Sequence, residues 1–226
     1  MIPLKDDVPR STFPWIILLL ISINILLFFQ EISLEKYLDL FIKNYGIIPT
    51  NFFSHKIDNF SRFYPLITST FLHGSWVHLL GNMWFLWVFG NNIEDRMGHF
   101  RFPIFYLGCG IASGLTHIYI NPESTIPSIG ASGAISGILG AYFVLYPFSR
   151  VLTLIPIFFI WFVKLPAFLF LGLWFLIQFF SGASSILSGG AAMTGGVAWW
   201  AHIGGFVAGI LLLPFFLVGR KRSKSR

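Results

Sequence analysis

Charged residues are absent from three long stretches of the chain, and these stretches define its predicted architecture. Residues 11–30, 63–93 and 165–219 contain no Asp, Glu, Lys or Arg. A bilayer core about 30 Å thick needs roughly 20 apolar residues per helix, so these stretches accommodate one, one and two membrane spans. Two more spans fit between Arg101 and Arg150. The pattern therefore predicts six transmembrane helices, near residues 14–30, 76–91, 101–120, 130–147, 165–183 and 199–218.

The composition agrees with an all-α membrane protein. Of the 226 residues, 55% are hydrophobic, 19% are aromatic and only 11% are charged, against about 25% charged residues in soluble domains. This balance excludes a disordered chain, a nucleic-acid-binding module and an ordinary soluble enzyme. The single cysteine, Cys109, excludes an internal disulfide and a metal site built from cysteines. We therefore expect the lipid bilayer, and no nucleic acid, as a partner.

The distribution of basic residues predicts the orientation. The net charge is +6, and five basic residues lie in the last seven positions. A basic segment beside a membrane helix is typical of the cytoplasmic side, so we interpret residues 219–226 as a cytoplasmic tail. An even number of spans then places residues 1–13 in the cytoplasm as well. The six-helix membrane domain occupies residues 14–218, and we expect it in the plasma membrane.

Two connections of the predicted domain are expected on the external side. Residues 31–75 are too long for a plain connector. Apolar residues recur within them at helical spacing, which suggests a helix lying in the membrane interface: Leu34, Leu38, Phe41, Ile42 and Tyr45. Residues 184–197 are rich in Gly and Ser and predict a mobile external loop.

Polar side chains inside membrane spans are costly, so their positions indicate function. His78 and Asn82 lie four residues apart at the start of the second predicted span, and therefore on one helix face. Ser132 begins the fourth span, and His202 begins the sixth. The predicted orientation puts all four residues at one depth, just below the external surface. A serine, a histidine and two further hydrogen-bond donors are the parts of an acyl-transfer site.

Small residues on the fourth and sixth spans would allow these groups to meet. Gly133 and Gly137 lie on one side of the fourth span, and Gly205 and Gly209 lie on one side of the sixth. Small residues at such spacing let helix backbones approach closely, which a hydrogen bond from serine to histidine requires. Similar glycine faces occur in many helix bundles and do not indicate catalysis by themselves.

Four ordered motifs resemble the rhomboid intramembrane serine proteases. They are His73-Gly-Ser-Trp-Val-His78-Leu-Leu-Gly-Asn82-Met83, Glu94-Asp-Arg96-Met-Gly98, Gly130-Ala-Ser132-Gly133-Ala-Ile-Ser-Gly137 and Ala201-His202-Ile-Gly-Gly205-Phe-Val-Ala-Gly209. The resemblance covers roughly residues 60–218 and is to the basic six-helix bacterial form. The family often has a Trp-Arg pair ahead of the second span, where this chain has Tyr64 and Pro65.

The resemblance implies roles for individual residues. Ser132 would be the nucleophile and His202 the general base. His78, Asn82 and the backbone N–H of Ser132 would form the oxyanion hole. The stretch from Glu94 to Arg96 matches a motif that we interpret as structural. The implied activity is serine endopeptidase cleavage of transmembrane helices near the external face.

The predicted spans contain no Asp or Glu, which limits the chemistry. No buried carboxylate is available to orient His202, so we predict a Ser-His dyad with the imidazole held by packing or by a carbonyl. The chain has no His-Glu-x-x-His zinc motif and no pair of acids inside spans. Without carboxylate or thiol ligands beside the histidines, we expect no metal and no cofactor.

The expected partners are transmembrane protein substrates, which must unwind locally because a peptide bond inside a helix is hidden. The external loop 184–197 and the phenylalanines of the fifth span are candidates for a lid and a lateral gate: Phe168, Phe170, Phe175, Phe179 and Phe180. An alternative for the loop is a flexible connector, and for the phenylalanines a lipid-facing surface. The oligomeric state is not predicted.

Two other functions are open at this point. A non-catalytic relative would bind or chaperone transmembrane clients, and it would be expected to lack Ser132 or His202, both of which are present. A transporter or channel would also contain polar residues in its spans. A transporter is expected to show interrupted helices in two corresponding halves, and the chain shows no such internal symmetry.

Overall fold

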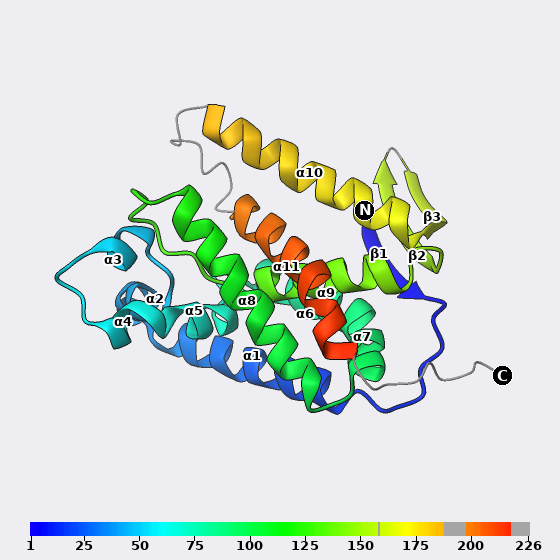
Figure 1. The fold of residues 1–226 in the computed structure, drawn as a ribbon, viewed down its shortest axis with the longest axis horizontal. Helices are drawn as coiled ribbons and strands as arrows, with labels where there is room; N and C mark the ends of the chain where they lie inside the picture. Colours follow the sequence, from blue (N-terminus) through cyan, green and yellow to red (C-terminus); the bar gives the residue numbers. More distant parts are fainter. Residues whose placement is uncertain (158, 188–197, 218–226) are drawn as a thin grey trace.

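The computed structural model describes residues 1–157, 159–187 and 198–217 and consists mostly of helices (Figure 1). A helix occupies each of the six predicted ranges. They are α1 Trp15–Ser33, α6 Trp76–Phe85, α8 Arg101–Ile120, α9 Ser132–Leu145, α10 Ala167–Leu187 and α11 Trp199–Leu217. Helix α6 continues into a π-helical segment, η3 Leu86–Gly90, and then into α7 Asn91–Met97.

Four helices within the described residues are long and apolar enough to cross a membrane, namely α1, α8, α10 up to Ser185, and α11. Helix α9 is apolar but has only 14 residues. These lengths fit a helical membrane bundle. It stays a prediction that all six segments cross the membrane and that both termini lie on the cytoplasmic side.

The buried core lies around α9, which packs against α8 and α11, and these two helices also pack against each other. Large aromatic side chains from several helices fill the space between these elements: Phe89, Phe102, Phe105, Tyr106, Tyr142 and Phe170. Helix α10 lies along one outer side of the bundle and α1 along the opposite side (Figure 1). Both outer helices expose large apolar side chains, including Leu26 on α1 and Phe180 on α10. Such exposure is expected where lipid, not water, surrounds the protein.

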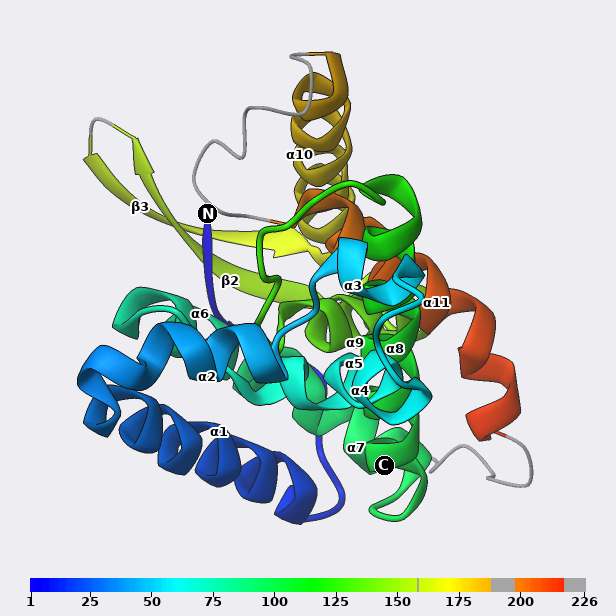
Figure 2. The same cartoon turned by 90° about the vertical axis from the view of Figure 1, so that its left-hand side faces the viewer.

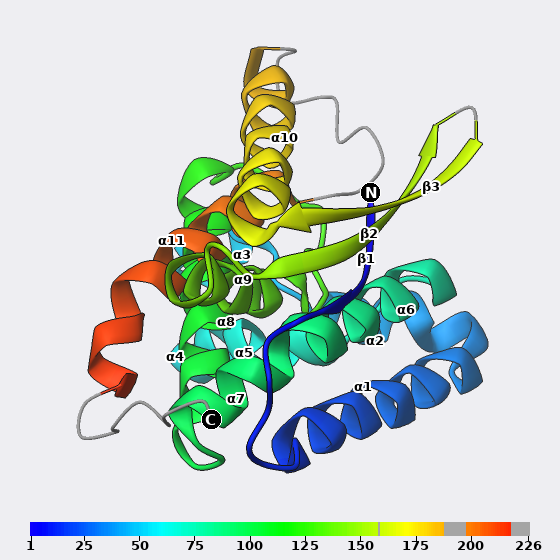
Figure 3. The ribbon, with the colours of Figure 1, turned by 90° about the vertical axis from the view of Figure 1, so that its right-hand side faces the viewer.

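A three-stranded antiparallel sheet corrects the all-α prediction. It consists of β1 Ile2–Asp6, β2 Arg150–Ile157 and β3 Phe159–Pro166, in the order β1-β2-β3. Residue Ile2 pairs with Leu154, and Arg150 pairs with Pro166. The β2–β3 hairpin projects away from the helices (Figure 2 and Figure 3). β-Branched and aromatic residues favour strands here, but both faces are apolar, so the sequence lacks the alternation that identifies a half-buried strand.

The predicted Gly-rich loop at 184–197 also needs correction. Helix α10 continues to Leu187, so residues 184–187 are helical. Residues 188–197 lie outside the described part of the chain, as do residues 218–226, which include the predicted basic tail.

The predicted external connection, residues 31–75, folds into a series of short helices. They are η1 Glu35–Tyr37, α2 Leu38–Tyr45, α3 Pro49–Phe53, α4 Asn59–Phe63, α5 Pro65–Thr68 and η2 Ser69–Phe71. The segment with helical spacing forms η1 and α2; its location in the membrane interface stays a prediction. At the positions that depart from the rhomboid pattern, Tyr64 donates a hydrogen bond to the Asn44 carbonyl, at 2.6 Å, and Pro65 is buried at the start of α5. The pair thus seats α5 against α2.

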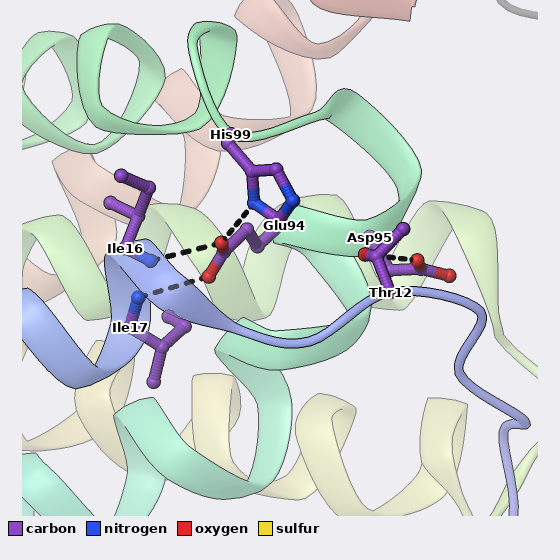
Figure 4. Close-up of polar contacts among 6 residues, drawn as sticks. All are labelled: Thr12, Ile16, Ile17, Glu94, Asp95 and His99. Atoms are coloured by element: carbon purple, nitrogen blue, oxygen red, sulfur yellow. Dashed lines mark hydrogen bonds and ion pairs between the residues drawn. The ribbon is translucent and has the colours of Figure 1, made fainter.

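Glu94 joins α7 to the start of α1 (Figure 4). Its carboxylate accepts hydrogen bonds from the backbone N–H groups of Ile16, at 3.0 Å, and Ile17, at 2.9 Å. It also contacts His99 Nδ1 at 2.5 Å. The first N–H groups of a helix have no partner within the helix, so this buried carboxylate caps α1. These contacts support the structural interpretation of the Glu94 motif.

Candidate active site

Ser132 and His202 meet at the starts of two neighbouring helices. Ser132 is the first residue of α9, and His202 lies in the first turn of α11. Ser132 Oγ and His202 Nε2 are 2.8 Å apart, a hydrogen-bond distance. This separation lies in the range of about 2.6–3.2 Å expected between a nucleophile and its general base.

Glycines allow α9 and α11 to touch backbone to backbone. A Cβ atom at Gly205 would lie 2.1 Å from the Gly133 carbonyl oxygen, and one at Gly209 would lie 1.9 Å from that of Gly137. Real Cβ atoms essentially never come within 3.0 Å of another atom. Any larger residue at these positions would therefore push the two helices, and with them Ser132 and His202, apart.

A side-chain amide holds the other nitrogen of the imidazole. His202 Nδ1 lies 2.7 Å from Gln178 Oε1, and Gln178 is buried in α10. Because the amide oxygen only accepts, Nδ1 carries the proton and Nε2 is left to accept from Ser132 Oγ. The Trp174 ring packs beside the imidazole, with ring centroids 6.0 Å apart. The imidazole is thus held by packing and by a side-chain carbonyl, the two alternatives that accompanied the dyad prediction.

The sequence interpretation did not identify Gln178. The available signal was its position, because it is a polar side chain in the charge-free stretch 165–219, where every polar group needs a partner. The statement that no carboxylate lies in a span also needs correction. Helix α1 ends at Ser33, beyond the predicted end at residue 30, and therefore contains the buried Glu31.

His78 and Asn82 line the same cavity as Ser132 and His202. This cavity has a volume of about 690 Å³ and is partly open, with residues from α6, α8, α9, α10 and α11 in its wall. The Ser75 hydroxyl caps the N-terminus of α6, where it accepts a hydrogen bond from the N–H of His78, at 3.2 Å. Helix α6 then presents His78 and Asn82 on one face.

Gly130 keeps these side chains close to the start of α9. Its φ angle of +127° strains any other residue, and a Cβ atom there would lie 2.7 Å from His78 Nε2 and 3.7 Å from Asn82 Nδ2. The two side chains therefore converge beside the loop that leads into Ser132. The structure brings together all four polar residues that the sequence placed at one depth.

The described residues contain no group of three or more His, Cys, Asp or Glu side chains arranged to hold a metal ion. The polar side chains of the cavity are the imidazoles of His78 and His202, the amide of Asn82, and the hydroxyls of Ser132 and of several other Ser and Thr residues. This set can donate and accept protons and can hold a developing negative charge.

A helical membrane bundle with a serine hydrogen-bonded to a histidine defines a class of candidate serine hydrolases. Comparison with known proteins identifies the family. The model of the rhomboid domain matches residues 61–219, and the chain belongs to the rhomboid family. As a rhomboid with several apolar helices, it is a membrane protein.

Three relatives illustrate the similarity. "Rhomboid-like protein 11, chloroplastic" of Arabidopsis thaliana is 38% identical over 80 residues, covering 35% of this chain and 28% of the relative. "Rhomboid protein 1, mitochondrial" of Saccharomyces cerevisiae is 27% identical over 175 residues, covering 76% and 45%. "Presenilin-associated rhomboid-like protein, mitochondrial" of Homo sapiens is 36% identical over 98 residues, covering 42% and 26%.

The chain thus spans less than half the length of these relatives. Their names assign two of them to mitochondria and one to chloroplasts. They give no support to the predicted plasma-membrane location.

Proposed function

We propose that this rhomboid protein is an intramembrane serine endopeptidase that cleaves transmembrane helices. The observation that carries the proposal is the hydrogen bond of 2.8 Å between Ser132 Oγ and His202 Nε2. Its partner contact, from His202 Nδ1 to Gln178 Oε1, fixes the tautomer that a general base needs.

In the proposed reaction, His202 Nε2 takes the proton of Ser132 Oγ while the oxygen attacks the carbonyl carbon of the scissile peptide bond. The resulting imidazolium is held by Gln178 through Nδ1–H. His202 then returns the proton to the leaving amine, and the carbon–nitrogen bond breaks to give an acyl-enzyme. A water molecule, deprotonated in the same way, releases the second product and restores Ser132.

The developing oxyanion would be held by the two α6 side chains and by a backbone N–H. Asn82 Nδ2 and the His78 ring face Gly130, close to the reacting serine. The Ser132 N–H lies at the start of α9, where the helix itself offers no acceptor. Loss of one such donor typically reduces the rate by about 10²–10³-fold.

Substrate access is proposed from the membrane, between α6 and α10. Val77 and Phe85 of α6 and Trp174 of α10 line the cavity, so separating these helices would widen it. Only three of the five phenylalanines predicted for the gate are exposed. Phe170 is buried against Phe89, with ring centroids 5.9 Å apart, and Phe175 packs on Phe206, while Phe168, Phe179 and Phe180 are exposed.

Cleavage of a transmembrane reporter by purified protein in liposomes, with a chelator present, tests the proposal. Ser132→Ala is expected to abolish cleavage and labelling by a fluorophosphonate probe. Ser136→Ala is the matched control, because it removes a buried hydroxyl one turn further along α9 that bonds the Ser132 carbonyl, at 2.6 Å. We expect this control to retain activity.

Two outcomes would contradict the proposal. Cleavage that persists in Ser132→Ala would remove the active-site assignment. If the wild type neither cuts nor is labelled, yet binds the reporter as well as Ser132→Ala does, the chain acts as a binder of transmembrane clients instead.

A further inference from the structure

A buried polar connection leads from the end of α1 to the catalytic cavity. We propose that Glu31 and His73 are positioning residues that fix the amide of Asn82 with its nitrogen toward the reacting carbonyl. The inference rests on the proposed function, since it assigns these two residues to the oxyanion hole of that same site.

Glu31 is the first member of this connection. The residue is 1% exposed, and its carboxylate oxygens lie 3.1 Å and 3.3 Å from the backbone nitrogen of His73. The N–H of His73 therefore donates to the carboxylate. A buried carboxylate on a membrane helix is costly, and such groups commonly mark functional positions. Here the carboxylate anchors the short segment that leads into α6.

His73 is the second member and is also 1% exposed. Its Nε2 atom lies 3.0 Å from Asn82 Nδ2, and its ring packs edge-on against that of His78, with centroids 5.1 Å apart. His73 thus touches both side chains proposed to hold the oxyanion. An amide nitrogen can only donate, so Nε2 must accept and the ring proton must lie on Nδ1.

Burial keeps this acceptor available. His73 lies in the connection before α6, and burial, with a smaller effect from His78, lowers its pKa to about 3. The ring is therefore neutral near pH 7. The carbonyl of Phe71 acts in the opposite direction on this pKa, as expected for a group that favours a proton on the ring.

The consequence for Asn82 is a fixed direction of its amide group. One N–H of Asn82 Nδ2 donates to His73, and the second is left for the substrate oxygen. If the amide rotated by half a turn, its carbonyl oxygen would face the lone pair of His73 Nε2. The same oxygen would then repel the negative charge that develops on the substrate oxygen. His73 therefore decides whether Asn82 offers a donor to the reaction.

A purely structural role explains the connection less well. Two polar side chains buried in a membrane protein cost free energy relative to apolar residues of similar size.

A double-mutant cycle with Asn82→Ala tests the role of His73. His73→Phe keeps a ring of similar size but removes the acceptor, and we expect it to lower kcat by about 10–10²-fold, within the loss of one oxyanion donor, with KM changed less than twofold. In the Asn82→Ala background the same substitution should have no further effect on kcat. His73→Gln, which restores a carbonyl acceptor, should recover most of the loss.

Glu31 is tested by a matched pair of substitutions. Glu31→Gln keeps an acceptor for the His73 N–H, and Glu31→Leu removes it. We expect the first to cleave at close to the wild-type rate, and the second to lower kcat as His73→Phe does, with no further effect in Asn82→Ala.

The outcomes separate this inference from the proposed function. Additive losses in the Asn82→Ala background, or variants that lower the thermal midpoint without changing kcat, would overturn the positioning role while the protease assignment stands. A wild type that neither cleaves the reporter nor reacts with a fluorophosphonate would overturn both.

Discussion

The backbone contact between α9 and α11 makes a sharp prediction for Gly205→Ala. The added Cβ atom would lie 2.1 Å from the Gly133 carbonyl oxygen, where at least 3.0 Å is needed. The obstacle is backbone on a neighbouring helix, so the helices must separate by about 0.9 Å, the difference between these distances. Gly133 follows Ser132 directly, and Gly205 lies one turn after His202.

If that displacement carries over to the site, the hydrogen bond of 2.8 Å between Ser132 and His202 lengthens to about 3.7 Å. This exceeds the range for proton transfer, and a misplacement of about 1 Å can cost roughly 10²-fold in rate. We therefore expect Gly205→Ala to lower kcat for a transmembrane reporter by about 10²-fold. It should also lower the thermal midpoint, because the tight helix contact is lost.

Gly172→Ala is the matched control for this experiment. Gly172 lies within α10, and a Cβ atom there meets nothing within 4 Å. Alanine has a higher helix propensity than glycine, so this variant should be at least as stable as the wild type and as active. Wild-type kcat in Gly205→Ala, measured beside an unaffected Gly172→Ala, would refute the view that this contact sets the distance from serine to histidine.

Three further predictions follow from contacts described above. Gln178→Leu leaves the proposed general base without its Nδ1 partner, so kcat should fall at least about tenfold with KM nearly unchanged; equal kcat would contradict this. Glu94→Ala uncovers two N–H groups of α1 and should cost about 2 kcal/mol in unfolding experiments, whereas the exposed Glu123→Ala should cost almost nothing. Between pH 6.5 and about 3, the unfolded chain binds a proton at His73 that the folded protein does not, because burial lowers this pKa. The stability of the folded protein should therefore decrease as the pH is lowered through this window. Thermal unfolding at pH 7 and pH 4 would measure the decrease, which should be smaller in His73→Gln.

Much of the helix plan follows from where charges are absent. A helix occupies each predicted range. This agrees with the rule that an apolar segment in lipid satisfies its backbone groups by forming a helix. Topology predicted one depth for the four polar residues of the site, and the resemblance to the rhomboid proteases implied their roles. Their distances were not predicted, because these depend on how closely glycines let α9 and α11 approach.

Each missed feature has a physical cause. The hairpin formed by β2 and β3 is apolar on both faces, so its period cannot be distinguished from that of a buried helix. Glu31 was assigned to a loop because a charge was taken to end the span, although the His73 N–H gives it a buried partner. Gln178 carries no charge and did not interrupt the apolar pattern. Glu31 and Gln178 both have partners far away in the sequence, His73 and His202.

The pairing of β1 with β2 has a consequence for the order of folding. Ile2 pairs with Leu154, and Trp84 donates a hydrogen bond of 2.5 Å to the Pro3 carbonyl. During synthesis from the N-terminus, β1 cannot pair until β2 has been made, after the segments that form α1, α6, α8 and α9. Contacts so distant in sequence form slowly because they close long loops. We expect β1 to be among the last elements to dock, after the helices beneath it have assembled.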